Sequence, residues 1–122
     1  MSWPIRYHAE RPERPEIGDC WPAPWLVAEG EVRTFFLSDA HLAARAAGAI
    51  TRAPLVVRLP GGTDFCVDGP TFSAGQRGTG GWAVTGEPPG LTLAPSINIG
   101  GSYHGWIQGG VITDDCDGRK FP

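Results

Sequence analysis

His104 is the residue best placed for chemistry in this chain. It follows Tyr103 and precedes Gly105 and Trp106, beside glycine-rich turns. A histidine in such a position can bind a metal, act as an acid or base, or line a pocket. Alternatively, its ring hydrogen-bonds a backbone carbonyl and packs on Trp106. The residue types leave both interpretations open.

Ser96 is a second catalytic candidate, because a base within hydrogen-bond reach, such as His104, would activate its hydroxyl. The surrounding Pro-Ser-Ile segment is typical of a strand, however, and the chain contains no G-x-S-x-G nucleophile elbow. The alternative is that the hydroxyl satisfies backbone groups at a bulge caused by Pro95. We therefore expect a structural role for Ser96.

Three side chains, Cys66, His104 and Cys116, could form a zinc site with an aspartate as the fourth ligand. Their spacing matches no zinc motif, and no Cys-x-x-Cys pair is present. The acidic residues around Cys116 fit no calcium loop and are more typical of a solvated turn. The sequence therefore predicts no metal cofactor, with zinc as the alternative.

Charge and composition exclude several function classes. The net charge is −3 and the 10 basic residues are scattered, so we expect no nucleic-acid partner. No apolar run approaches the roughly 20 residues of a membrane span, and the first residues lack the apolar core of a signal peptide. Three widely spaced cysteines do not form a secreted disulfide framework. These features predict a soluble protein of a reducing cytoplasm without a membrane partner.

The length of 122 residues indicates one domain preceded by an arm. Residues 1–30 contain five prolines and three tryptophans, which favour extended backbone. This Pro/Trp-rich arm either packs on its own domain or binds a partner or neighbouring subunit. Residues 31–122 are expected to form a single β-rich domain.

The alanine-rich segment at about 38–48 predicts the one helix of that domain. Ser38 is a suitable N-cap, and Asp39 lies in the first turn, where the helix dipole favours negative charge. Gly48 supplies the C-terminal stop. His41 and Arg45, one turn apart, are expected to face solvent.

The rest of the domain predicts consecutive strands. Segments 55–59 and 63–67 flank Pro-Gly-Gly, and segments 102–108 and 111–113 flank Gly-Gly, so each pair predicts a hairpin. Residues 91–99 alternate as a half-buried strand. Residues 69–81 are expected to form a glycine-rich loop. The predicted fold is mainly β (α+β), a small antiparallel meander or barrel-like sandwich with one short helix.

Four short runs together resemble a family of small phage and prophage proteins of unknown function, often given a misleading ammonia-monooxygenase label: WAVTG (82–86), LTLAPSI (91–97), HGWI (104–107) and GVI (110–112). The resemblance covers roughly residues 54–115. Many members carry a Cys-x-x-Cys pair ahead of the tryptophan and a cysteine directly before the histidine. Here residues 59–64 read LPGGTD and Tyr103 precedes His104, which implies a variant that has lost the zinc cysteines.

The aromatic surplus indicates a contact surface, because five tryptophans are many for a small β-rich domain. We expect a phage- or prophage-encoded accessory module that binds a protein without catalysis. The expected contact residues are His104, Trp106, Tyr103 and Trp82, and the partner is a host protein, a phage protein or a second copy. One alternative is a virion structural or decoration component that uses the arm. Another is a metal-assisted or serine-type hydrolase centred on His104.

Overall fold

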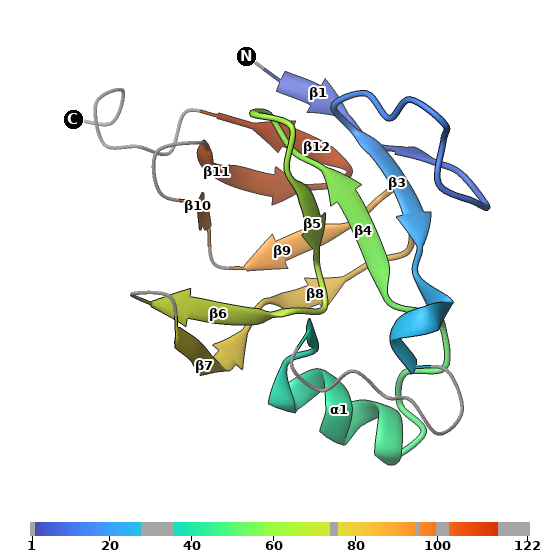
Figure 1. The fold of residues 1–122 in the computed structure, drawn as a ribbon, viewed down its shortest axis with the longest axis vertical. Helices are drawn as coiled ribbons and strands as arrows, with labels where there is room; N and C mark the ends of the chain where they lie inside the picture. Colours follow the sequence, from blue (N-terminus) through green and yellow to red (C-terminus); the bar gives the residue numbers. More distant parts are fainter. Residues whose placement is uncertain (1, 28–35, 74–75, 95, 100–102, 115–122) are drawn as a thin grey trace.

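The computed structural model describes residues 2–27, 36–73, 76–94, 96–99 and 103–114. Within these residues, the strands form four open sheets, accompanied by one α-helix and one short 3-10 helix (Figure 1). This arrangement confirms the predicted mainly β fold class with one short helix.

The first four-stranded sheet joins the two ends of the described chain. Its strands lie in the order β1-β12-β11-β10, and each adjacent pair is antiparallel. Gly109 and Gly110 connect β11 to β12 with positive φ angles of 56° and 81°, as a tight hairpin turn requires. This confirms the predicted Gly-Gly hairpin. The strands are β1 (Ser2–Pro4), β10 (Ile97–Ile99), β11 (Tyr103–Gln108) and β12 (Val111–Thr113).

The second four-stranded sheet has the order β2-β3-β4-β5. The predicted hairpin around Pro-Gly-Gly is confirmed, because β4 and β5 pair antiparallel on either side of it. One pair departs from the predicted antiparallel pattern, since β2 and β3 are parallel. The strands are β2 (Arg6–Tyr7), β3 (Asp19–Pro22), β4 (Leu55–Arg58) and β5 (Asp64–Cys66).

Two further hairpins complete the strands: β6 (Pro70–Ser73) with β7 (Gln76–Gly81), and β8 (Ala83–Thr85) with β9 (Thr92–Ala94). The prediction of a loop over residues 69–81 was therefore wrong. A Cβ on Gly81 would lie 2.6 Å from the Ser38 Cβ, so glycine lets β7 pass close to the start of the helix. The strand predicted at 91–99 is represented by β9 and β10, and Pro95 lies outside the described residues.

The helices are η1 (Pro24–Val27) and α1 (Asp39–Ala46). Ser38 caps α1, because its Oγ accepts a hydrogen bond from the His41 amide at 3.1 Å. The helix prediction is thus confirmed. The orientation expected for His41 was wrong, because its side chain is buried with only 4% of the residue exposed.

The core consists of two apolar clusters on opposite faces of the second sheet. Along β4, Leu55 and Val57 face the larger cluster, whereas Val56 faces a smaller one beneath η1 and α1. The larger cluster therefore lies between the two four-stranded sheets, with residues of β9, and the smaller one lies between the second sheet and the helices. The larger cluster contains Ile5, Cys20, Leu55, Val57, Leu59, Val67, Leu91, Leu93, Ile97, Tyr103, Ile107 and Ile112.

The Pro/Trp-rich segment at residues 1–30 contributes β1, β2, β3 and η1 to these layers. Ile5 is buried between the two sheets, and Arg6 Nε donates to the buried Asp19 carboxylate at 3.1 Å. The described part of this segment is therefore packed on the rest of the chain.

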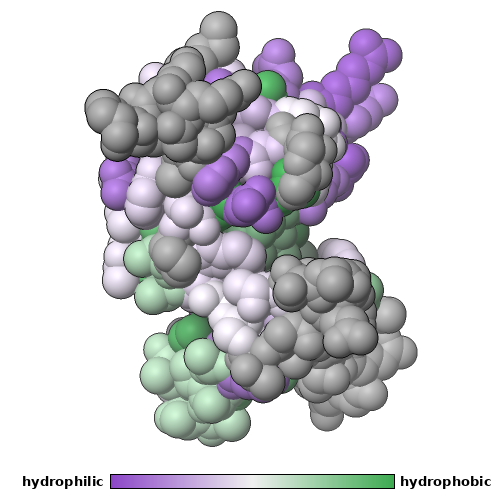
Figure 2. All heavy atoms as spheres, turned by 90° about the vertical axis from the view of Figure 1, so that its left-hand side faces the viewer, coloured by the Kyte–Doolittle hydropathy of each residue, from purple (hydrophilic) through white to green (hydrophobic). Residues whose placement is uncertain are grey.

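The surface differs between the ends of the long axis. On the face that Figure 2 shows, hydrophilic side chains gather at the end where β1 lies, and apolar side chains gather on part of the end that carries the alanine-rich α1. In the described part of the chain, no helix is long and apolar enough to cross a membrane.

Candidate functional site

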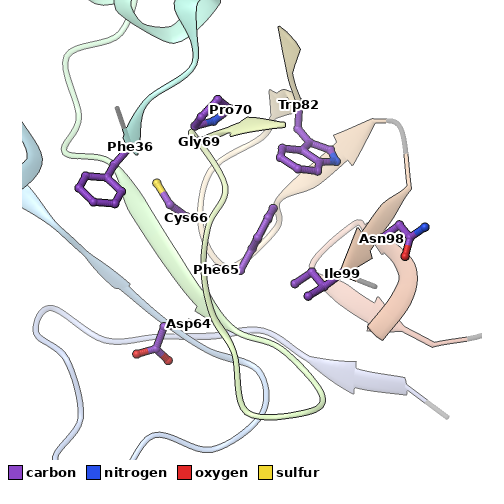
Figure 3. Close-up of a pocket in the computed structure, with 9 residues that line it drawn as sticks. All are labelled: Phe36, Asp64, Phe65, Cys66, Gly69, Pro70, Trp82, Asn98 and Ile99. Carbon is purple, nitrogen blue, oxygen red and sulfur yellow. The ribbon is translucent and has the colours of Figure 1, made fainter. Parts of the chain in front are cut away.

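A cleft of about 440 Å³ opens between β5 and β10, which are the edge strands of the two four-stranded sheets. Its volume lies within the range of roughly 300–1,000 Å³ that is typical of ligand pockets. Figure 3 shows the Cys66 side chain pointing toward Phe36 on one side of β5 and the Phe65 ring pointing toward Trp82 on the other side. The lining residues are Phe36, Asp64, Phe65, Cys66, Gly69, Pro70, Trp82, Asn98 and Ile99.

The aromatic walls of the cleft are fixed by their contacts. The rings of Phe65 and Trp82 meet edge to face, with centroids 5.0 Å apart and an interplanar angle of 84°. The Trp82 indole donates through Nε1 to the Ser96 carbonyl at 3.3 Å, which holds the ring in place. Phe36, on another side of the cleft, remains 49% exposed. The cleft is therefore apolar, ring-lined and open to solvent.

The polar groups of the cleft lie at its margin. Asp64 accepts from Arg58 Nε at 2.6 Å and from Arg11 Nη2 at 3.4 Å, so two guanidinium groups balance its charge. Asn98 is exposed, and within the described residues its amide makes no hydrogen bond. Among the described residues that line it, the cleft thus offers a neutral amide and no unbalanced negative charge.

The thiol of Cys66 belongs to the apolar wall. Burial raises its pKa to about 12, and the nearby Asp68 carboxylate adds to the shift. Burial likewise raises the pKa of Cys20 to about 12. The two cysteines face different core clusters on opposite sides of the second sheet. Both thiols therefore stay protonated near neutral pH and do not face each other.

Alkylation tests this protonation state. A pKa of about 12 leaves a thiolate fraction roughly a thousandth of that of an ordinary thiol. In a Cys116→Ser protein at pH 8, we expect iodoacetamide to modify Cys66 at least about 100-fold more slowly in the folded state than in urea. Mass spectrometry of the alkylated peptide measures both rates. Equal rates would show that the thiol is ionised and accessible.

The predicted contact residues His104 and Trp106 lie on the outer face of the first sheet. Along β11, Tyr103, Gly105 and Ile107 are buried, whereas the alternate residues are partly or fully exposed. Since cross-strand partners share a face, neighbouring side chains of β10 and β12 join them. We define the outer face by Asn98, His104, Trp106, Gln108, Val111 and Thr113.

Tyr103 and Trp82, also predicted as contact residues, lie elsewhere. Tyr103 is buried in the larger core cluster, and its hydroxyl lies 2.5 Å from the Thr113 carbonyl, to which it donates. Trp82 lines the cleft. The outer face and the cleft are neighbours, however, because Asn98 lines the cleft and pairs with His104 across the strands.

Among the described residues, the structure shows no contact that joins the predicted catalytic or metal residues into a site. Ser96 contacts Trp82 through its backbone carbonyl, and within the described residues no hydrogen bond joins its hydroxyl to His104. Cys116 lies outside the described residues. Among the residues that the structure describes, no three His, Cys, Asp or Glu side chains are grouped so that they could hold a metal ion.

A polar cluster that sequence reasoning missed lies on the other side of Trp82. The Arg52 guanidinium forms two hydrogen bonds with Asp68, both of 2.8 Å, and the Leu55 amide donates to the same carboxylate at 3.0 Å. Burial alone would raise the pKa of Asp68, but the hydrogen bonds from Arg52 and the backbone hold it well below its usual range. The carboxylate is therefore ionised and ties three segments together.

His41 completes this polar cluster. Arg45 Nε donates to His41 Nε2 at 3.3 Å, so Nε2 is the acceptor and the ring proton lies on Nδ1. Nδ1 is 3.3 Å from Asp68 Oδ1, yet the direction does not satisfy hydrogen-bond geometry. We interpret this contact as electrostatic. The cluster borders a cavity of about 220 Å³, which Trp82 also lines.

Comparisons with known proteins identified no relative of this chain. No protein-family model matches this chain, and neither the curated proteins nor the solved structures gave a match. The resemblance to small phage and prophage proteins therefore stays a prediction.

Proposed function

We propose that this protein is a phage- or prophage-encoded accessory module that binds another protein through its outer face and catalyses no reaction. One observation carries this proposal: His104 and Trp106 project from β11 on the side opposite the core. Val111, an aliphatic residue that is itself 37% exposed, lies on the same face. Tryptophan beside a polar ring on an open sheet face is typical of the centre of a protein interface.

The described residues support binding more directly than catalysis. The Tyr103 hydroxyl is engaged by the Thr113 carbonyl, and the pKa of the Cys66 thiol is too high for a nucleophile at neutral pH. Neither the virion alternative nor the hydrolase alternative gains a specific observation. The partner's identity, whether a host protein or a phage protein, is left to experiment.

Affinity capture tests the proposal. We expect the wild-type protein to retain a specific protein from a bacterial host lysate, and the His104→Ala/Trp106→Ala double variant to lose it. Truncation of interface-centre residues of this kind costs about 2 kcal/mol or more, which weakens binding at least about 30-fold. Mass spectrometry identifies the retained protein, and size-exclusion chromatography with the purified partner confirms the complex.

A matched control is Tyr7→Ala, which removes a 44% exposed aromatic side chain from β2, away from the outer face. This variant should retain the partner as the wild type does. If the double variant is folded by circular dichroism and still binds the purified partner with unchanged affinity, the outer face is not the interface.

A further inference from the structure

We infer that the cavity of about 220 Å³ beside His41, Arg52 and Asp68 binds a small carboxylate, the anion of a short-chain organic acid. None of the residues that line this cavity belongs to the outer face. The cavity therefore adds a small-molecule ligand to the protein partner proposed above, and its occupancy does not depend on that partner.

The Arg52 guanidinium has two N–H groups that no protein atom uses. Its Nη1 donates to the Ala53 carbonyl at 3.0 Å and to Asp68 at 2.8 Å, and its Nη2 donates to Asp68 at 2.8 Å. Among the described residues, the hydrogen on Nε and the second hydrogen on Nη2 have no acceptor. These two N–H groups lie side by side on one edge of the planar group and match the two oxygens of a carboxylate. Asp68 thus holds Arg52 in position and leaves a second edge for a ligand.

His41 supplies a further unused donor. Its ring proton lies on Nδ1, and within the described residues this nitrogen is the one buried polar side-chain atom without a hydrogen bond. Asp68 Oδ1 is 3.3 Å away but outside hydrogen-bond geometry. A buried donor without an acceptor is destabilising and is usually satisfied by a water or an ion. Because His41 lines the cavity, a ligand oxygen there can be the missing acceptor.

Charge favours a singly charged anion. The polar cluster contains two guanidinium groups, Arg45 and Arg52, and the single carboxylate of Asp68. That carboxylate already accepts hydrogen bonds from Arg52 and from the Leu55 amide. Asp39, in the first turn of α1, is exposed and does not line the cavity. The cluster therefore has an excess of one positive charge, which a carboxylate complements.

The size of the cavity and its apolar lining select a short chain. Ile50, Trp82 and Val84 also line the cavity, so part of its wall is apolar. Since a water molecule occupies about 30 Å³ in the liquid, the volume of 220 Å³ corresponds to about seven waters. A carboxylate group on Arg52 with about three further carbons against the apolar residues fits this space.

A nuclear magnetic resonance titration with butyrate tests the site. The matched ligand is butyramide, which has the same shape without the charge, and sodium chloride at equal ionic strength controls for salt. We expect the Arg52 Nε–H, the His41 Nδ1–H and the Ala40 amide, which lies at the cavity, to shift with butyrate. Butyramide should bind at least about tenfold more weakly, because it lacks the charge-assisted pair of hydrogen bonds.

Arg52→Lys is the diagnostic variant, because lysine keeps a positive charge beside Asp68 but lacks the paired N–H groups. It should weaken butyrate binding at least about tenfold. Arg58→Lys makes the same change in an Arg–Asp pair that does not line the cavity, and it should leave binding unchanged. If Arg52→Lys does not fold, Ile50→Phe fills part of the cavity and should weaken binding by a similar factor.

Three results would each show that the cavity holds water and does not select a carboxylate. They are the absence of shifts beyond those that sodium chloride causes, equal binding of butyrate and butyramide, and unchanged binding in a folded Arg52→Lys protein. Inorganic phosphate that binds at least about tenfold more tightly than butyrate would assign the cavity to a phosphate group and overturn the carboxylate.

The outer face and the cavity can be tested separately. The His104→Ala/Trp106→Ala protein should bind butyrate as the wild type does, because neither residue lines the cavity. Arg52→Lys should likewise retain the protein partner. Failure of the carboxylate site is therefore distinguishable from failure of the proposed outer-face function.

Discussion

Replacing Gly105 with alanine is expected to lower the free energy of unfolding by about 3 kcal/mol, the upper part of the range for an overpacked site. A Cβ at this position would lie 1.8 Å from the Thr113 carbonyl oxygen and 2.4 Å from the Tyr103 hydroxyl. The first contact is with backbone, which cannot move aside like a flexible side chain. β11 and β12 must therefore separate locally, and the Tyr103 ring must shift as well.

Urea unfolding followed by tryptophan fluorescence measures this loss. Gly62→Ala is the comparison, because a Cβ added at Gly62 has no atom within 4 Å, although Gly62, unlike Gly105, has a positive φ of 86°. That control should cost about 1 kcal/mol, the strain of a left-handed backbone alone. Equal losses in the two variants would contradict the close packing of Tyr103 across Gly105.

Asp68→Asn is expected to destabilise the protein by about 3 kcal/mol or more. The substitution removes the negative charge of a side chain that is only 2% exposed and leaves the Arg52 guanidinium without a counter-charge. Loss of one partner of a largely buried ion pair is costly for this reason, whereas loss of an exposed pair is not. Asp64→Asn is the comparison, because the Asp64 side chain is 38% exposed, and it should cost less than about 1 kcal/mol.

The pH dependence of stability provides a second measurement of Asp68. Its folded-state pKa is lower than that of an unfolded aspartate, so the carboxylate contributes stability at pH values above the unfolded pKa of about 4. This contribution is lost as the pH falls toward the folded pKa. The difference in unfolding free energy between wild type and Asp68→Asn should therefore be largest near neutral pH and shrink below about pH 4.

Urea titrations at several pH values between 7 and 2.5 test this relation. Asp19 also has a lowered pKa, so both proteins should lose stability in acid, and only their difference reports on Asp68. A difference that stays constant across this range would show that the Asp68 carboxylate is not held ionised by its partners.

Sequence patterns predicted the elements that local chemistry determines. The Gly109-Gly110 turn needs positive φ at both positions, which glycine adopts most readily. The helix was predictable because Ser38, Asp39 and the alanines all favour the same start and conformation. Residues 69–81 were not predicted as a hairpin because their glycines carry no alternating apolar pattern, and β7 instead packs closely against Ser38.

The candidate site was less accessible to sequence reasoning because its residues meet only through the tertiary fold. The cleft combines residues from the segment before α1, from β5, β6 and β10, and Trp82, and no local spacing links these segments. Trp82 was predicted to lie on the contact surface with His104, and Cys66 was predicted to be a zinc ligand. The sequence carries no pattern that indicates the ion pair of Arg52 and Asp68, because an isolated Asp-Gly near a strand is more typical of a turn.

The pairing of β1 with β12 has a consequence for how the chain folds. Ser2 lies opposite Thr113, so this edge of the first sheet closes only when segments at the two ends of the described chain meet. Bringing such distant segments together has a large entropic cost of loop closure. Small β-rich proteins dominated by such contacts fold on the order of milliseconds to seconds. Until β1 docks, the outward edge of β12 is an unpaired template for other strands, which makes prompt closure a protection against aggregation.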